Sequence, residues 1–373
     1  MVSQWSALGF GPFASSSPFG DFRQEFMNRG VRRVRTGLRI GVGLAAGAVI
    51  LASCGTTAVA PPVHLSGTPA LSFDVPLTNV ACTLNDVCVA LGTSSAGSGP
   101  TSVAEFSTPH GDWLNLALPS GPSTLLTTTA CSGSQCLIGG SRPGSDLLWL
   151  FDSHGDSLSA LTAPAQGIGV SSLTCNALVC AMLDTGPGGV PRFSVSSDVG
   201  TTWSTPEPLA FAKGDAVTAF SCGTTAICAL GLMTPAHVFA LYVTSDVGAT
   251  WNEQATPSSW TTLTSLSCQQ RRCVALAATA TASLLVRSST FTRTWKVTTL
   301  THRASALACT PLQQCVVVGQ RSDDDPWLAM VHDKKTTAVK LRYVPSPLLD
   351  VACGSKVCAA IGITTLLSVP SNT

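Results

Sequence analysis

Cysteines are the residues of this chain best suited to chemistry, because all but one of the 15 fall into closely spaced pairs. In each pair a short apolar run ends in Cys, four or five residues follow, and a second Cys opens another apolar run. Paired cysteines can hold zinc, carry redox chemistry or form a disulfide. The pairs are Cys82–Cys88, Cys131–Cys136, Cys175–Cys180, Cys222–Cys228, Cys268–Cys273, Cys309–Cys315 and Cys353–Cys358.

The spacing within each pair favours a disulfide. Two cysteines at this spacing on a tight hairpin lie opposite each other, at a Cα separation that a disulfide accepts. Zinc sites use closer cysteine pairs and bring two of them together. We therefore expect seven disulfides, each contributing roughly 2 kcal/mol, with no metal and no other cofactor. Their regularity indicates an oxidising compartment.

The pairs also mark a repeat. Their first cysteines follow one another at intervals of 49, 44, 47, 46, 41 and 44 residues. A period of 40–50 residues with four short strands per unit is typical of a β-propeller blade. The sequence thus predicts an all-β, seven-bladed propeller of four-stranded antiparallel blades with one hairpin disulfide each. Radially arranged blades would also keep the cysteine pairs apart, which counts against shared zinc sites.

The last unit is too short for four strands. Residues Leu349 to Pro370 have room for about three strands, whereas Ala70 to Pro76, before the first unit, read as a strand without a partner. We expect this N-terminal strand to complete the last blade, because such closure removes open sheet edges.

Two segments, Ser196–Trp203 and Thr244–Trp251, fit the pattern S/T-x-D-x-G-x-T-W. Such a segment suits a hairpin turn between the third and fourth strands of a blade. The Asp accepts backbone N–H groups, the Gly takes a positive φ and the Trp packs between strands. The residues expected to have this structural role are Asp198, Gly200, Trp203, Asp246, Gly248 and Trp251.

With these two segments the chain resembles the Asp-box (BNR, sialidase-like) propeller superfamily, which includes sortilin-type domains and photosystem II assembly factors. The resemblance implies turns on the outer rim, which argues for a structural role over sugar binding. Sialidases of this superfamily need an arginine cluster, a Tyr/Glu pair and an Asp. The usual Arg-Ile-Pro is absent, and Tyr242 and Tyr343 are the only tyrosines. No catalytic residue is therefore carried over, and no other catalytic motif is present.

The N-terminal region has the arrangement of an export signal. Five arginines between Arg29 and Arg39 precede the apolar run Ile40–Ala52, which is shorter than a membrane span. The exit, Leu51-Ala52-Ser53-Cys54, resembles a bacterial lipobox, and Cys54 is the cysteine left over by the pairing. We expect lipidation of Cys54. A plain signal peptide or an uncleaved anchor are the alternatives, and Met27 is an alternative start.

The predicted organisation follows from these features. Residues 1–53 form a tail and signal, residues 54–68 a flexible tether, and residues 69–373 the propeller. Charged residues make up 11% of the chain and its net charge is +1, so nothing favours nucleic acid as a partner.

A ligand site is expected where the loops between second and third strands, and between consecutive blades, meet over the channel. The most polar such loop is Arg321–Trp327, which is suited to a cation or a basic partner, or is a solvated loop. Trp260 is a further candidate. The candidate ligand-face residues are Arg192, Arg321, Asp323, Asp324, Asp325 and Trp327.

These observations lead to a functional hypothesis. We expect a membrane-anchored extracytoplasmic propeller that serves as a non-enzymatic scaffold for an unidentified envelope protein or glycan. The alternatives are a glycan-active hydrolase or lyase that uses acidic residues at the channel mouth, and an assembly factor for a membrane complex.

Overall fold

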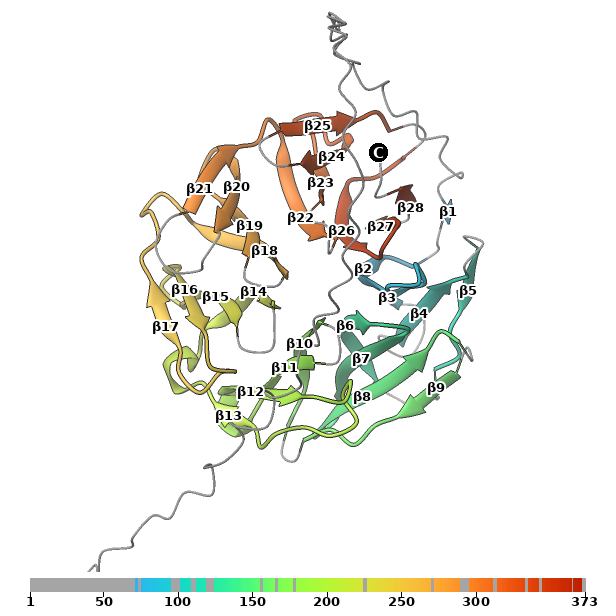
Figure 1. Cartoon of the computed structure of the whole chain (residues 1–373), viewed down its shortest axis with the longest axis vertical. Coiled ribbons are helices and arrows are strands. Elements are labelled where there is room, and N and C mark those ends of the chain that lie inside the picture. Colours follow the sequence, from blue (N-terminus) through green and yellow to red (C-terminus); the bar gives the residue numbers. More distant parts are fainter. Residues whose placement is uncertain are drawn as a thin grey trace, which may run out of the picture. The chain divides into compact units, whose positions relative to one another are not determined.

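The computed structural model describes residues 71–72, 75–94, 101–108, 112–118, 124–154, 157–164, 167–176, 179–223, 227–269, 272–288, 295–310, 314–332, 335–341, 344–363 and 365–370. All of them belong to the compact unit formed by residues 61–373. Seven four-stranded antiparallel sheets stand around one axis, as Figure 1 shows. The described part is therefore a seven-bladed β-propeller, as the repeat predicted.

The first four blades follow one another along the chain. Blade 1 contains β2 (Leu77–Cys82), β3 (Cys88–Ser94), β4 (Thr101–Ser107) and β5 (Trp113–Asn115). Blade 2 contains β6 (Leu125–Ser132), β7 (Gln135–Arg142), β8 (Ser145–Asp152) and β9 (Ser157–Ala160). Blade 3 contains β10 (Val170–Asn176), β11 (Val179–Thr185), β12 (Pro191–Ser196) and β13 (Glu207–Pro208). Blade 4 contains β14 (Ala216–Cys222), β15 (Cys228–Met233), β16 (Phe239–Thr244) and β17 (Asn252–Gln254).

The remaining blades complete the ring. Blade 5 contains β18 (Thr262–Gln269), β19 (Arg272–Ala278), β20 (Ser283–Ser288) and β21 (Trp295–Thr299). Blade 6 contains β22 (Arg303–Cys309), β23 (Cys315–Gln320), β24 (Pro326–His332) and β25 (Lys335–Val339). Blade 7 contains β26 (Leu348–Cys353), β27 (Val357–Gly362), β28 (Thr365–Pro370) and β1 (Leu71–Ser72). Two 3₁₀ turns, η1 (Pro187–Gly189) and η2 (Ala210–Ala212), lie in loops, and none of the helices described is long enough to span a bilayer.

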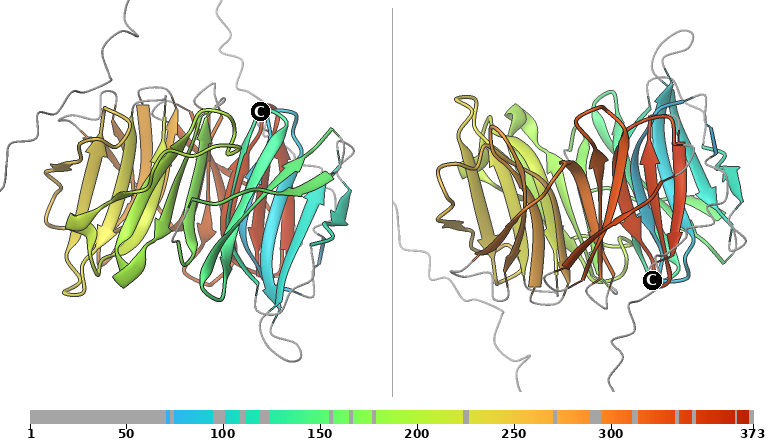
Figure 2. Two further views of the ribbon diagram at one scale, coloured as in Figure 1. Left: turned by 90° about the horizontal axis from the view of Figure 1, so that it is seen from below. Right: turned by 90° about the horizontal axis from the view of Figure 1, so that it is seen from above.

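The hydrophobic core lies between neighbouring blades, which stand side by side in the edge views of Figure 2. Middle strands are covered on both faces, so they read as continuous apolar runs such as Val316–Val318, all buried. Between blades 1 and 2, Phe106 and Phe151 pack with their ring centroids 5.2 Å apart. Outermost strands such as β9 and β25 are mostly exposed and correspondingly polar.

The ring closes as predicted. Strand β1 pairs with β28, with Leu71 opposite Leu366 and Ser72 opposite Thr365, and so supplies the fourth strand of blade 7. The innermost strands β2 and β26 of the first and last blades contact each other. The two ends of the propeller are therefore joined both at the outer edge and at the channel.

All seven predicted disulfides are present. Each joins the innermost strand of a blade to the second strand, and the two Cα atoms are 3.9–4.1 Å apart. The cysteines of each pair face each other close to the hairpin, as in Cys82 opposite Cys88, and in blades 2, 3 and 5 one more residue pair follows them. Such close Cα atoms are typical of the non-hydrogen-bonded pairs of an antiparallel ladder. The pairs are therefore structural crosslinks of the blades.

The two S/T-x-D-x-G-x-T-W segments form the predicted turns between third and fourth strands. The Asp198 carboxylate accepts hydrogen bonds from the backbone N–H of Thr202 at 2.8 Å and from its hydroxyl at 2.6 Å. Asp246 binds Thr250 in the same way.

The glycines of these turns have the expected positive φ, 84° at Gly200 and 88° at Gly248. A Cβ atom on Gly248 would also lie 2.2 Å from the Phe193 ring of blade 3. Each turn therefore needs glycine both for its conformation and for its close contact with the preceding blade.

Candidate functional site

The innermost strands of all seven blades enclose a cavity of about 430 Å³ at one end of the channel. The cavity lies at the end where the cysteine hairpins are. Its wall consists of the last residues of β2, β6, β10, β14, β18, β22 and β26, up to or just beyond the first cysteine of each pair. Every blade therefore contributes equivalent positions to one pocket.

Among the described residues that line this cavity, none has a charged side chain. Its polar groups are hydroxyls and amides, such as Thr129, Thr174, Asn176 and Gln269, and the rest is aliphatic, Phe220 or cystine sulfur. A cystine offers no thiolate, and neither hydroxyls nor amides titrate near neutral pH. The described wall is thus suited to binding neutral groups and supplies no general acid or base.

Side chains three residues before the first cysteine connect blades around the channel. In four blades a side-chain oxygen at this position accepts a hydrogen bond from the next blade. The donor is the backbone N–H of the residue that lies two positions before the first cysteine of that next blade. The bonds run from Val80 to Asp350 at 3.0 Å, from Thr129 to Asn79 at 2.7 Å, from Leu173 to Thr128 at 3.1 Å and from Leu307 to Ser265 at 3.1 Å. These bonds fix the register between neighbouring blades.

A second set of bonds comes from the residue immediately before the first cysteine, here called the pre-cysteine position. The hydroxyls of Thr174, Ser221 and Ser267 accept the backbone N–H of the first cysteine in the next blade. The N–O distances are 3.4, 3.0 and 3.2 Å, respectively. The remaining pre-cysteine residues are Ala81, Ala130, Ala308 and Ala352, whose methyl groups cannot accept a hydrogen bond.

Asp350 has a special place in this network, since it joins the last blade to the first. One carboxylate oxygen accepts from Val80 N–H and, at 3.4 Å, from the Asn79 amide, while the other accepts from Val351 N–H at 2.9 Å. The residue at the equivalent position of blade 6 is Ala306, which offers no acceptor to Val351. Burial raises the pKa of Asp350 to about 6, against the lowering effect of the two backbone donors.

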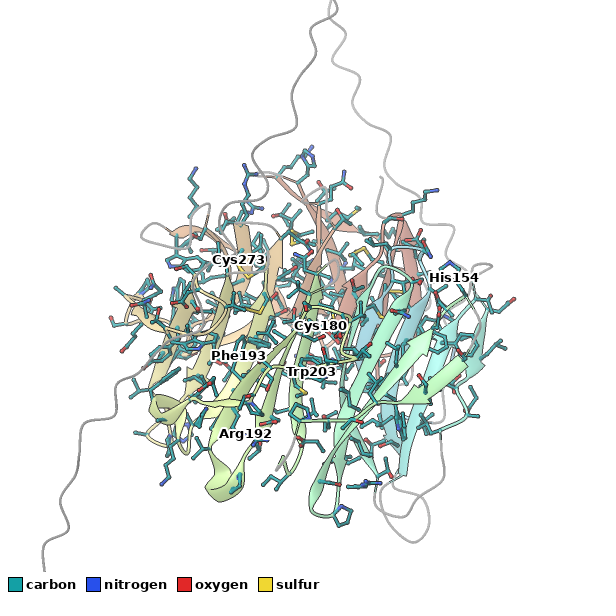
Figure 3. The ribbon with its side chains drawn as sticks, turned by 60° about the horizontal axis from the view of Figure 1, so that its bottom comes forward. His154, Cys180, Arg192, Phe193, Trp203 and Cys273 are labelled. Atoms are coloured by element: carbon teal, nitrogen blue, oxygen red, sulfur yellow. A yellow bond between two sulfur atoms is a disulfide. The ribbon has the colours of Figure 1, made fainter. Side chains whose placement is uncertain are left out.

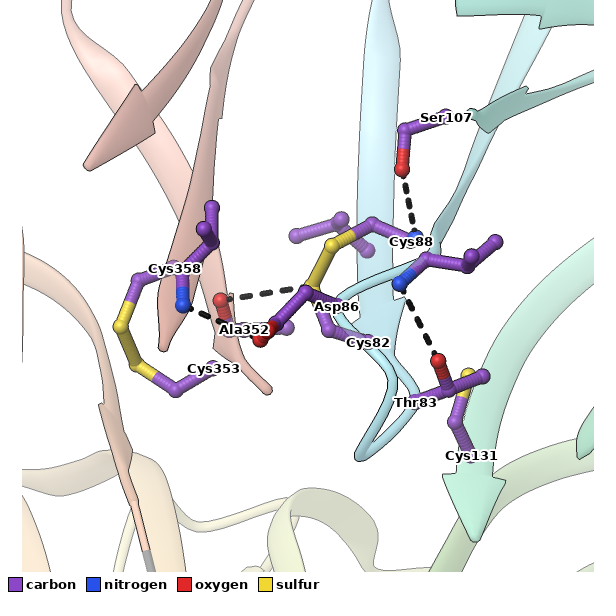
Figure 4. The surroundings of a disulfide bond; sticks show 12 residues. Cys82, Thr83, Asp86, Cys88, Ser107, Cys131, Ala352, Cys353 and Cys358 are labelled. Carbon is purple, nitrogen blue, oxygen red and sulfur yellow. Dashed lines mark hydrogen bonds between the residues drawn. A yellow bond between two sulfur atoms is a disulfide. The ribbon is translucent and has the colours of Figure 1, made fainter. Parts of the chain in front are cut away.

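The wall at blades 7 and 1 is also tied together by Asp86 (Figure 4). This carboxylate, in the hairpin between Cys82 and Cys88, accepts the backbone N–H groups of Lys356 and Val357 at 2.8 and 3.1 Å. It also accepts the Ser355 hydroxyl at 3.1 Å. The closure of the ring therefore has polar contacts at the cavity rim in addition to strand β1.

A buried charged cluster lies on the second and third strands of blades 2 and 3, toward the strand ends away from the cysteine hairpins. Arg192, labelled in Figure 3, donates two hydrogen bonds of 2.7 Å to the carboxylate of Asp184, which lies opposite it on the neighbouring strand. Asp146 of blade 2 is 8% exposed and packs directly on Gly167. Burial, then the charge of Asp184, raises the pKa of Asp146 to about 6. Asp184 therefore has a cationic partner, whereas neither carboxyl oxygen of Asp146 has a hydrogen-bond partner among the described residues.

Two residues of the predicted ligand face are not available to a ligand, and that part of the prediction is wrong. Trp327 is 2% exposed and packs with Leu276 and Leu285 of blade 5, because β24 starts at Pro326 and turns this side chain into the core. Arg192 is 8% exposed and occupied by Asp184. Trp260, at 6% exposure, is likewise a core residue.

The acidic loop of the predicted face stays exposed but stands apart. Arg321, Asp323, Asp324 and Asp325 form the β23–β24 hairpin of blade 6, closed by the bond from Arg321 N–H to the Asp325 carbonyl. Arg192 belongs to blade 3, so two blades separate the loop from it on the shorter path around the ring. Among the described residues, no three His, Cys, Asp or Glu side chains are arranged to hold a metal. Cys54 lies outside the described residues.

The sequence did contain a signal for the groups that were missed. Lining up the seven units on their first cysteine shows a polar residue three positions earlier in five of them, Asn79, Thr128, Ser172, Ser265 and Asp350. The pairing of Asp184 with Arg192 follows from the β11–β12 register, which places them directly opposite each other. Asp146 shows no sequence signal, because only the fold brings it near blade 3.

Comparisons with known proteins support the fold. No protein family model matches the chain, and no curated protein matches its sequence. Among solved structures, a chain of the mitotic checkpoint complex is similar with a TM-score of 0.59 and 11% identity, over 90% of this chain and 99% of that chain. YCF48 bound to D1 peptide is similar with a TM-score of 0.55 and 13% identity, over 80% and 95%.

A third similar structure is a catalytically inactive virginiamycin B lyase from Staphylococcus aureus with quinupristin. Its TM-score is 0.57 and its identity 8%, over 81% of this chain and 98% of that chain. At such low identities the similarity establishes the propeller fold and nothing about activity, because the same fold carries unrelated functions.

Proposed function

We propose that this chain is an exported, lipid-anchored propeller of the Asp-box type that acts as a non-enzymatic scaffold for another envelope component. The observation that carries the proposal is the uncharged cavity to which all seven blades contribute. A pocket of hydroxyl, amide, aliphatic and cystine groups suits recognition of a neutral ligand and lacks the titratable groups that hydrolysis needs.

The disulfides support the location outside the cytoplasm. Seven crosslinks form and persist in an oxidising compartment, whereas cytosolic thiols are kept reduced. The lipobox-like segment before Cys54 supports the anchor. A thioether-linked diacylglycerol, which has two acyl chains, would hold the propeller at the membrane surface through the tether at residues 54–68.

The hydrolase alternative has less support. The acidic residues Asp323, Asp324 and Asp325 lie on one exposed hairpin, and Asp184 is neutralised by Arg192. Asp146 has the raised pKa of a general acid, but it lies buried against Gly167. Glycoside hydrolysis needs two carboxyl groups on either side of an accessible bond.

The test is a pull-down of the full-length chain from envelope membranes, run beside a screen of glycan and peptide substrates. We expect a defined partner and no turnover. A second chain, with Cys54→Ala, should leave the membrane fraction and lose incorporation of labelled fatty acid. Clear turnover together with the absence of any partner would overturn the proposal.

A further inference from the structure

The free edge of each innermost strand faces the channel, and its N–H groups alternate in direction. The residue after the first cysteine bonds toward the second strand of the blade, as Thr83 N–H does to Val87 and Gly354 N–H does to Val357. The first cysteine and its disulfide partner form a non-hydrogen-bonded pair of the antiparallel ladder. The backbone N–H of the first cysteine therefore points away from the second strand and toward the preceding blade. The bonds to Thr174, Ser221 and Ser267 confirm this direction.

Four consecutive blades lack that acceptor. The residues that would accept from Cys353, Cys82, Cys131 and Cys175 are alanines of the preceding blades, Ala308, Ala352, Ala81 and Ala130 in that order. Within the described chain, no side chain accepts these four backbone N–H groups, which we call the donor arc. The arc spans blades 7, 1, 2 and 3, more than half of the ring.

The geometry shows that the alanines stand where the acceptors would be. The carbonyl oxygen of Ala352 lies 3.6 Å from Sγ of Cys82, and that of Ala308 lies 3.9 Å from Sγ of Cys353 (Figure 4 shows the first contact). Because Thr174, Ser221 and Ser267 accept such an N–H from the equivalent position in the other blades, we expect a serine in place of each alanine to bring an oxygen close to the N–H of the donor arc.

The cavity wall differs between the two sides in the same way. The cysteines of the donor arc are half-buried, whereas Cys222, Cys268 and Cys309, whose N–H groups are bonded, are at most 9% exposed. On the donor-arc side the hydroxyl of Ser132, a residue 7% exposed, also has no hydrogen-bond partner among the described residues. The four N–H groups and the Ser132 hydroxyl thus lie on one side of the cavity. The Thr310 hydroxyl, at the equivalent position of blade 6, also has no partner among the described residues, but it does not line the cavity.

We propose that the donor arc binds the main-chain carbonyl groups of an extended, uncharged polypeptide segment of a partner protein, inserted into the hairpin end of the channel. This inference rests on the proposed scaffold function and names its site and the chemical class of its partner. A backbone N–H without a partner is a strong donor, and the main-chain carbonyls of an extended peptide are matching acceptors. The four donors come from four different strands around the channel, so this contact differs from the addition of a strand to one sheet edge.

The lining favours a peptide over a glycan or an ion. Sugar recognition relies on exposed aromatic faces and on free amide or carboxylate groups. Here Phe220 is 9% exposed, and the amides of Asn176 and Gln269 donate to the carbonyls of Gly223 and Cys309. A charged ligand would meet no opposite charge in the described wall. Two positions before the first cysteine, most side chains are apolar and packed in the core between blades, so this part of the wall offers a ligand chiefly backbone.

The test supplies the missing acceptors. In the variant Ala81→Ser/Ala130→Ser/Ala308→Ser/Ala352→Ser, each donor-arc N–H gains the hydroxyl that the other three blades already have. The probes are a phage-displayed library of random heptapeptides and a glycan array, both applied to the full-length chain. We expect uncharged peptides to be selected and to bind the variant at least about tenfold more weakly.

Amide hydrogen exchange shows whether the substitutions act as intended, since exchange at the four donor-arc cysteines should slow while the melting temperature stays equal or rises. The matched control Ala160→Ser/Ala210→Ser/Ala236→Ser/Ala338→Ser changes four exposed alanines outside the cavity and should retain peptide binding. Unchanged peptide affinity in the serine variant, unchanged exchange, or binding of glycans alone would each overturn the proposal. The scaffold function itself would survive those results and fails only if substrate turnover appears without any partner.

Discussion

Asp350 gives the sharpest prediction about how the ring is held together. Its carboxylate bridges blades 7 and 1 and accepts two backbone N–H groups, and burial raises its pKa from 3.8 to about 6. An acid whose pKa is higher in the folded state favours folding most in its protonated form. The stabilisation is complete below the unfolded pKa and is lost as the pH rises through about 6.

The magnitude follows from the shift. Each pKa unit corresponds to about 1.4 kcal/mol, so ionisation of Asp350 costs the folded state about 3 kcal/mol at neutral pH. About 2–3 kcal/mol of this develops between pH 4 and pH 8. In Asp350→Asn the side chain cannot ionise, so this part of the pH dependence should disappear.

The assay is guanidinium unfolding of wild type and Asp350→Asn, followed by tryptophan fluorescence across pH 4–8. Relative to wild type, the free energy of unfolding of the variant should rise by about 2–3 kcal/mol from pH 4 to pH 8. The control Asp246→Asn removes a carboxylate whose pKa is lowered, chiefly by the Thr250 hydroxyl, so its pH dependence has the opposite sign. Parallel pH profiles for wild type and Asp350→Asn would show that the ionisation of Asp350 does not destabilise the folded state.

Three further perturbations test other parts of the fold. Deleting residues 69–77 removes β1 and the start of β2, and should lower the melting temperature and the secreted yield of the whole propeller. A melting temperature equal to that of the intact protein would show that β1 does not close the ring. Arg192→Met leaves the Asp184 carboxylate buried without a partner and should cost about 3–5 kcal/mol of unfolding free energy, with Arg142→Met as an exposed control. Gly248→Ala should destabilise the fold more than Gly133→Ala. Both glycines have positive φ, but only at Gly248 would the added Cβ collide with a neighbouring side chain, that of Phe193. Equal melting temperatures of the two variants would contradict this.

The propeller could be predicted because its signals repeat. Seven cysteine pairs at blade period give the blade count and the disulfides, and the short last unit gives the partner strand for β1. The turns at Asp198 and Asp246 follow from local hydrogen-bonding groups within eight residues, so the sequence contains all their partners.

The site was harder to predict, because its contacts are non-local. Val80 and Asp350 are 270 residues apart, and only closure of the ring brings them together. The sequence places Trp327 in a loop, because Pro326 marks the end of a polar run. In the structure strand β24 begins at that proline and buries the next side chain, Trp327. The cavity is formed by one short segment from each blade, so no single stretch of sequence indicates it.

Binding of the partner at the hairpin end of the channel, and not at the opposite face, is the central prediction. It is tested most directly by photo-cross-linking in intact envelopes, with a benzophenone amino acid placed at Leu84 or at Val238. Leu84 is 48% exposed at the cavity, whereas Val238 is 59% exposed on the β15–β16 hairpin at the other end. We expect a discrete protein adduct from Leu84 that the four-serine variant abolishes, and none from Val238. Adducts from Val238 alone, or a Leu84 adduct that the serine variant leaves unchanged, would contradict it.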